Sequence, residues 1–412
     1  LYICMVFHHY IVIVLLLFAL DSSRSSMGSI GVASADFGLD VFKELKVQHV
    51  NENILISPLT IISALSMVYI GSRESTRAQI DKVVPFDKIA GFKEAIESQC
   101  NASGSFQFSL KDVFGQITKR SDNYSLSFAS RLYAEETYQI RPEYLQCVKD
   151  LYKDGVETIS FRKAADQARE IINSWVESQT SGAIKNILQP DSVDQETETI
   201  LVNAIYFKGL WKKAFKDEDI QTVPFKMTEQ ESKPVRMMYQ IGSFKVAEVA
   251  AEKVKILEIP YASGHLSMLV FLPDDASGLE QLESAITSKK IMEWTSSDIM
   301  EERKVKVYLP RIKIEEKYNL TSVLVALGVT DLFSSSANLS GISSAESLKI
   351  SQAVHEAFLE IYEEGSEAVG STRAGKEDAS VSEEFKADRP FLFFIKHIPT
   401  KSILFFGRYF SP

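Results

Sequence analysis

Glu363–Gly370 reads EEGSEAVG, a pattern that fits both a strand and a loop. In an extended chain, successive side chains point to opposite faces. The alternation puts Ser366, Ala368 and Gly370 on one face, and Glu367 and Val369 on the other. One face therefore carries only small side chains and suits tight packing, although the glycines and the polar run after them are typical of an exposed loop. Because the segment fits both a packed strand and an exposed loop, we predict that it changes conformation.

The composition is that of an ordinary globular protein, with 412 residues, 45% hydrophobic and 24% charged. The net charge of −10 argues against nucleic acids, heparin-like polyanions and anionic membranes as general partners. No internal repeat, low-complexity tract or Pro-rich linker divides the body of the chain. We therefore expect no binding of nucleic acid or heparin and no entry into a membrane. We also expect a monomer.

Residues 1–26 differ from the rest of the chain. Tyr10–Leu20 is an unbroken apolar run of 11 residues, too short to span a membrane and similar to the core of a signal peptide. Met27 looks like a second start. The segment is interpreted either as a signal-like leader or as an over-extended gene model.

The order of the periodic patterns predicts an α+β fold. Helical spacing occurs early, at Phe37–Leu45, after Ser57-Pro58 and at Ala165–Thr180. Strand patterns come later, at Ile200–Lys208, Ile256–Ile259, Leu266–Leu272, Val305–Leu309, Phe391–Ile395 and Ile403–Phe406. We expect helices mostly first and large antiparallel sheets after them, because the helix–strand alternation of a doubly wound sheet is absent.

The chain lacks the motifs of catalysis and cofactor binding. It has no Gly-x-Ser-x-Gly elbow, no phosphate-cradling glycine loop and no CxxC pair. His355-Glu356 begins like a zinc-protease motif, but Leu359 stands where the second histidine is needed. We expect no enzyme activity, catalytic residue, metal or cofactor. His355 lies among apolar residues, which predicts a core histidine with a hydrogen-bond partner.

Several distinctive motifs follow one another along the chain. They are Asn53–Pro58, Leu201–Trp211, Ala326–Phe333, Asn338–Ile342 and Pro390–Phe393. The chain resembles the serpin family across Met27–Pro412, and resembles its egg-white members most. This resemblance implies one serpin domain over residues 27–412, with three β-sheets, about nine helices and an exposed reactive-centre loop.

The resemblance makes the opening segment the hinge of that loop: Glu364, Gly365, Ser366, Glu367, Ala368, Val369 and Gly370. Family spacing places the reactive bond at Ala379-Ser380, with Ala379 fourteen residues after Gly365. In inhibitory serpins, cleavage there is followed by insertion of the loop into a sheet as a new strand. The small Ala379 suits an elastase-like serine protease as the partner. Arg373 offers trypsin-like bait, but cleavage there leaves an arm too short for full insertion.

Two functions remain open. Egg-white serpins include an abundant non-inhibitory protein that carries a bulky charged residue where this chain has Ser366. Burial of Ser366 costs little, whereas burial of a charge is expensive. We expect a secreted serpin of the inhibitor class that retains loop insertion. The alternative is a non-inhibitory egg-white storage or nutrient protein with a vestigial loop.

The resemblance also assigns structural sites. Asn203 and His355 match positions where a buried hydrogen bond holds the central strands together, with Ser57 nearby, and Trp211 lies where insertion starts. Cys100 and Cys147, the only cysteines after residue 26, are two buried thiols or a disulfide, and secretion implies the disulfide. Four sequons follow the leader, at Asn101, Asn123, Asn319 and Asn338. Among them, the resemblance favours Asn319 as the glycan site.

Overall fold

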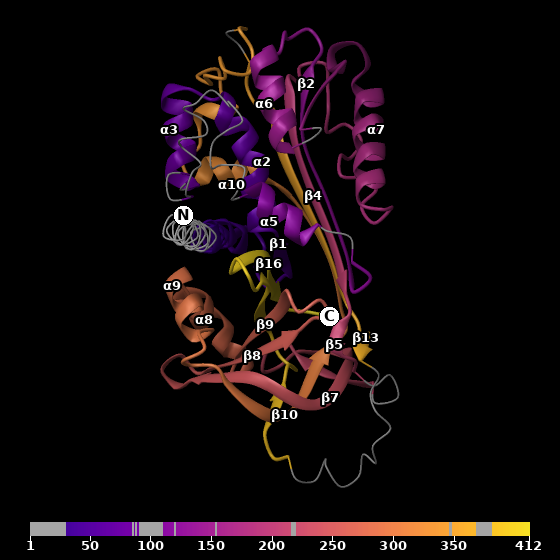
Figure 1. The fold of residues 1–412 in the computed structure, drawn as a ribbon, viewed down its shortest axis with the longest axis vertical. Coiled ribbons are helices and arrows are strands. Elements are labelled where there is room, and N and C mark those ends of the chain that lie inside the picture. Colours follow the sequence, from indigo (N-terminus) through magenta and orange to yellow (C-terminus); the bar gives the residue numbers. More distant parts are fainter. Residues whose placement is uncertain are drawn as a thin grey trace, which may run out of the picture.

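The computed structural model describes residues 30–84, 86, 89, 110–118, 121–152, 155–215, 220–345, 348–367 and 381–412. Figure 1 shows an elongated molecule in which long strands run along much of its length, with most of the helices toward one end. Residues 1–26 and 368–380 lie outside the described residues, so the interpretations of the leader and of the reactive bond Ala379-Ser380 stay predictions.

A five-stranded sheet forms the centre. Its order is β11 (Ile312–Asn319), β12 (Gln352–Ile361), β4 (Thr199–Gly209), β2 (Tyr124–Glu135) and β3 (Val156–Ile159). The middle strand β4 pairs directly and in parallel with β12, from Gln352 opposite Ile200 to Glu360 opposite Lys208. Nearly every residue of β4 is buried, which explains its continuous apolar run: both faces of this sheet are covered.

Helices cover the two faces of this sheet. α2 (Pro58–Gly71) is buried at all of its positions, with Pro58 at the first helical position, where no backbone N–H is needed. α7 (Phe161–Gln179) lies on the other side of the long strands (Figure 1) and buries one stripe that includes Ile172 and Val176. The other described helices are 30–48, α3 (Glu74–Val83), α5 (Leu110–Ile117), α6 (Pro142–Tyr152), α8 (Leu279–Ala285), α9 (Ser288–Trp294) and α10 (Leu320–Ala326).

The second sheet carries most of the remaining strands. It runs β1 (Ile54–Ile56), β16 (Ser402–Tyr409), β15 (Phe391–His397), β9 (Leu266–Pro273), β8 (Val254–Pro260), β7 (Ser232–Val249), β10 (Glu301–Pro310) and β14 (Glu384–Lys386), with β6 (Gln221–Lys226) beside β7. A third sheet has two short parallel strands, β5 (Trp211–Lys213) and β13 (Gly365–Glu367). β13 is the first part of the hinge.

The predicted fold class is confirmed: the described residues form an α+β structure with three sheets and nine α-helices. Each predicted helix and strand is present, but the central sheet is mixed and not antiparallel, since β12 pairs with β4, and β2 with β3, in parallel. α7 begins at Phe161 instead of Ala165. An extra turn precedes the main helix, and Ala164, whose backbone is non-helical, links the two. The early strand β2 has no counterpart in the sequence prediction, since its alternating serines weaken the apolar signal. Within the described residues, no helix is long and apolar enough to cross a membrane.

Gly407 tests the packing of the second sheet. A Cβ atom at this position of β16 would lie 2.1 Å from Cζ of Phe393. Gly407→Ala should therefore lower the free energy of unfolding by about 1–3 kcal/mol, seen as a lower urea midpoint. Gly115→Ala is the control, because a Cβ there, in α5, meets nothing within 4 Å. Equal midpoints for the two variants would show that the packing is misassigned.

Candidate functional site

The candidate site is the line along which β4 and β12 meet, together with the hinge at its end. After β12 the chain continues as β13 against β5, which itself follows β4. The Trp211 N–H donates to the Glu364 carbonyl at 2.9 Å, and the Phe215 N–H donates to the Glu363 carbonyl at 2.9 Å. The hinge therefore extends the parallel β12–β4 pair beyond the end of the central sheet.

The first hinge residues fit closely against the chain after β5. A Cβ atom at Gly365 would lie 2.4 Å from the backbone nitrogen of Ala214, so no larger residue fits without a shift. Ser366 is exposed, and its hydroxyl donates to the Lys212 carbonyl at 3.3 Å. Ala368, Val369 and Gly370 lie outside the described residues, and the two-faced alternation beyond Glu367 stays a prediction.

Side-chain contacts fasten the end of β12 to its neighbours on both sides, β11 and β4. Arg311 and Glu363 form a two-pronged ion pair, with Nε and Oε2 2.7 Å apart, and both side chains are about four-fifths buried. Lys208 Nζ and Glu364 Oε2 form an ion pair at 3.3 Å. The indole of the fully buried Trp211 donates to the Tyr362 carbonyl at 2.6 Å. The resemblance named Trp211, whereas the two ion pairs were not predicted.

A buried polar network lies under the middle of the β4–β12 pair, on the face that α2 covers. His355 Nδ1 and Asn203 Oδ1 are 2.6 Å apart, and the Ser57 backbone N–H donates to His355 Nε2 at 3.1 Å. Because Nε2 accepts, Nδ1 carries the proton and donates to Asn203. Thr60 donates its hydroxyl to Asn203 Oδ1 at 3.0 Å and accepts from Asn203 Nδ2 through its carbonyl at 3.1 Å. The network joins β4, β12 and the start of α2.

The structure thus brings together the three predicted residues Ser57, Asn203 and His355. Ser57 contributes its backbone, since its buried hydroxyl has no hydrogen-bond partner among the described residues. Thr60 completes the network and was not predicted, although it lies only two residues after Pro58. Burial lowers the pKa of His355 to about 3, so the imidazole is neutral at physiological pH.

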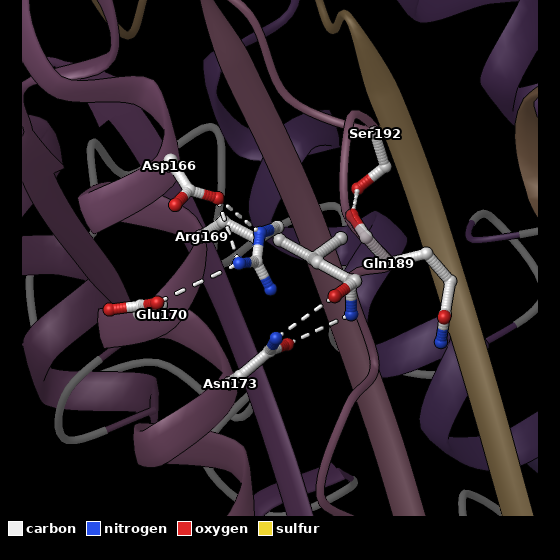
Figure 2. Close-up of polar contacts among 7 residues, drawn as sticks. Asp166, Arg169, Glu170, Asn173, Gln189 and Ser192 are labelled. Atoms are coloured by element: carbon white, nitrogen blue, oxygen red, sulfur yellow. Dashed lines mark hydrogen bonds and ion pairs between the residues drawn. The ribbon is translucent and has the colours of Figure 1, made fainter.

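The segment 180–198 links α7 to β4. It crosses the β4–β12 pair on the opposite face of the sheet, the face that α7 covers. Asn173 of α7 is 6% exposed; its Nδ2 donates to the Leu188 carbonyl, and its Oδ1 accepts from the Leu188 N–H, both at 2.9 Å (Figure 2). Further along, the Asn186 carbonyl accepts from Lys317 of β11 at 3.1 Å. Since β4 and β12 lie between β2 and β11, the segment spans them.

Apolar contacts fix this crossing segment to the sheet. Ile184, Ile187 and Leu188 belong to one buried cluster with residues of β4 and β12. Figure 2 also shows Arg169 of α7 beside Asp166, with its Nε 2.9 Å from Asp166 Oδ1. A new strand between β4 and β12 would therefore have to displace the segment that Asn173 holds.

The remaining predicted sites lie away from this line. Asn319 is exposed at the start of α10, where its Oδ1 accepts from the Thr321 N–H at 3.0 Å. Cys147 is disulfide-bonded, and Cys100 lies outside the described residues, so the pairing of these two cysteines stays a prediction. Among the described residues, no group of three or more His, Cys, Asp or Glu side chains could hold a metal ion.

His355 should make stability depend on pH. Histidine in the unfolded chain has a pKa near 6.5. Between about pH 3 and 6.5 the unfolded chain therefore binds a proton that His355 in the folded protein does not bind. Stability therefore falls as the pH drops through this window. His355→Gln should lower stability at pH 7 and reduce the further loss between pH 6.5 and 4.5, measured by urea unfolding at each pH. An unchanged slope in His355→Gln would contradict the assignment.

Asn173 should control how firmly the crossing segment is held. Asn173→Ala leaves the N–H and C=O of Leu188 unpaired, which should cost about 1–3 kcal/mol. Hydrogen exchange at the Leu188 amide should accelerate accordingly. Gln189→Ala is the control, because within the described part of the chain this exposed side chain bonds only the Asn186 carbonyl. Equal exchange rates in both variants would show that Asn173 does not hold the segment.

Comparisons with known proteins agree with this architecture. The family model described as Serpin (serine protease inhibitor) matches residues 32–412. The ovalbumin of Dromaius novaehollandiae is 69% identical over 386 residues, which cover 94% of this chain and 100% of the relative. A crystal structure of uncleaved ovalbumin has a TM-score of 0.88 and 67% identity, covering 93% of this chain and 100% of that chain.

A second solved structure bears on the hinge. It is a loop-inserted form of a cleaved ovalbumin mutant in which an arginine is replaced by threonine, with a TM-score of 0.84, 63% identity, and coverage of 93% of this chain and 100% of that chain. Close ovalbumin relatives are secreted egg-white proteins, and serpins are inhibitors or storage proteins, not enzymes. The predicted family is confirmed: this chain belongs to the serpin (serine protease inhibitor) family and is ovalbumin-like.

Proposed function

We propose that this ovalbumin-like serpin is a secreted protein of the inhibitor class, whose loop inserts between β4 and β12 after cleavage at Ala379-Ser380. The observation that carries the proposal is the hinge itself. β13 already continues the β12–β4 pair, and its next exposed side chain is the small Ser366. No bulky or charged group at Ser366 has to be buried when the strands part.

The strand directions favour insertion. β12 and β4 are parallel, so a strand that turns back from the end of β12 runs antiparallel to both. Insertion replaces one parallel pairing with two antiparallel ones, which are slightly more stable per residue. Ser366 to Ala379 supplies fourteen residues, enough to pair along the 11 residues of β4.

The loop-inserted relative supports the role of residue 366. That ovalbumin mutant carries threonine in place of an arginine. By resemblance, ovalbumin carries a bulky charged residue where this chain has Ser366, and we take that residue to be the substituted arginine. A small hydroxyl residue is therefore native to the hinge of this chain, and we infer that insertion needs no substitution here.

The partner is proposed from the residue before the cleaved bond. Ala379 is small, and a shallow elastase-like pocket accepts small side chains in preference to long or charged ones. Together with the serpin assignment, this makes an elastase-like serine protease the proposed target.

The test uses two arginine substitutions on adjacent hinge residues. The secreted protein, Ser366→Arg and Glu367→Arg are each incubated with an elastase-class protease. The cleaved wild type should gain thermal stability, because a strand has been added to the central sheet. Ser366→Arg should lose this gain, since the charge would enter the packed face, whereas Glu367→Arg should keep it on the outer face.

Denaturing electrophoresis of the same samples reports inhibition. A covalent band containing both serpin and protease supports the inhibitor class. Cleavage without any gain in thermal stability in the wild type would overturn the proposal of loop insertion.

A second candidate is a non-inhibitory egg-white storage protein with a vestigial loop. The 69% identity to ovalbumin favours it. It predicts cleavage without a covalent complex, and great abundance in egg white without a matching protease. A gain in thermal stability without a covalent band would show that the loop of this chain inserts but does not inhibit the protease.

Export to an oxidising compartment accounts for two further proposed sites. We infer a disulfide between Cys100 and Cys147, in keeping with the disulfide-bonded state of Cys147. Asn319 is exposed and is the proposed glycan site. Non-reducing peptide mapping of the secreted protein tests both assignments.

A further inference from the structure

Asn123 lies at a turn where β2 begins, within the sequon Asn123-Tyr124-Ser125. Its backbone is held on both sides: its N–H donates to the Ser121 hydroxyl at 3.1 Å, and its carbonyl accepts from the Leu210 N–H at 2.8 Å. Its side chain is partly exposed and makes no hydrogen bond to the described residues. The hydroxyl-bearing Ser125 is exposed. The amide can therefore change without loss of a contact that supports the fold.

Asn338 shows the opposite situation. Its Nδ2 donates to the Glu74 carboxylate at 3.1 Å, and its Oδ1 accepts from the Ser340 N–H at 3.3 Å. Its backbone is bonded to α3 and the residue before it, through the Thr76 hydroxyl and the Arg73 N–H. A sugar on this nitrogen would press against α3 and disturb a charge-assisted hydrogen bond. The fold therefore accepts a glycan at Asn123 much more readily than at Asn338.

We propose that Asn123 carries an N-linked glycan, an inference that rests on the secretion of the chain in the proposed function. In the transfer, the Asn123 side-chain nitrogen bonds to C1 of a lipid-linked oligosaccharide. The bond from C1 to the lipid pyrophosphate breaks, the pyrophosphate leaves with its electron pair, and the nitrogen gives up one proton. The partly exposed turn leaves room for the sugar in the folded protein.

The position gives this glycan a place next to the hinge. The Leu210 N–H bonds to Asn123, and the next residue, Trp211, bonds to Glu364 of the hinge. The glycan therefore stands one strand away from the point where insertion begins. It leaves the β4–β12 line itself clear, because β2 lies on the far side of β4.

The experiment expresses the full chain in secreting eukaryotic cells and compares Asn123→Gln, Asn319→Gln and Asn338→Gln. Each secreted protein is treated with peptide-N-glycosidase and examined by electrophoresis and peptide mass spectrometry. Asn123→Gln and Asn319→Gln should each lose one glycan, and Asn338→Gln none. In the wild type, residue 123 should be found as aspartate in its peptide after treatment with the glycosidase.

Two substitutions of Ser125 test the same glycan while Asn123 itself stays unchanged. Ser125→Ala should abolish the Asn123 glycan, and Ser125→Thr should retain it. A modified Asn319 with an unmodified Asn123 would overturn this inference and leave the proposed secretion standing. A secreted chain with no glycan at either site would overturn this inference and the Asn319 assignment together. Failure to enter the medium at all would overturn the secretion on which both depend.

Discussion

The direct parallel pairing of β4 and β12 is the constraint on which the other features depend. These strands are neighbours although they are far apart in sequence, and nine residue pairs join them from Gln352 and Ile200 to Glu360 and Lys208. Parallel pairing is slightly weaker per residue than antiparallel pairing. The centre of the sheet can therefore gain stability by admitting another strand, provided that the two strands can first be parted.

Three sets of contacts oppose that parting. Below the sheet, the neutral His355 and Asn203 join the two strands to each other and to α2. Above it, Asn173 holds the crossing segment over both strands. At the hinge end, Lys208 of β4 pairs with Glu364, and the Trp211 indole donates to the Tyr362 carbonyl. A state held by local contacts against a more stable arrangement is kept by a kinetic barrier, and its lifetime is set by the rate of opening.

The sequence predicts the elements whose signals are local. The apolar spacing after Ser57-Pro58 and the continuous run around Asn203 each give the correct helix or strand, because periodicity and proline position act within a few residues. β2 escaped this reasoning, since its serines face partly exposed surroundings. Strand order and register depend on tertiary packing, and no local pattern contains them. The resemblance to serpins implied the number of sheets, and the strand order and register were not predicted.

The candidate site divides in the same way. His355 in an apolar run is predictable as a core histidine, because a buried polar group needs a partner. That partner is 152 residues away in sequence, and only the family resemblance named it. Arg311 and Glu363 are separated by 52 residues, with nothing in either segment to indicate the other. Asn173 did leave a signal, a polar residue on the apolar stripe of α7, beside Ile172 and Val176.

The central claim is that β4 and β12 can part and admit the chain that follows the hinge. Hydrogen–deuterium exchange on the protein before and after cleavage at the loop measures this directly. The account predicts that, after cleavage, the amides from Ser366 to Ala374 become protected as a strand, while those of β4 and β12 remain protected by new partners. Amides from Ser366 to Ala374 that still exchange freely after cleavage, beside an unchanged β4–β12 pair, would contradict it.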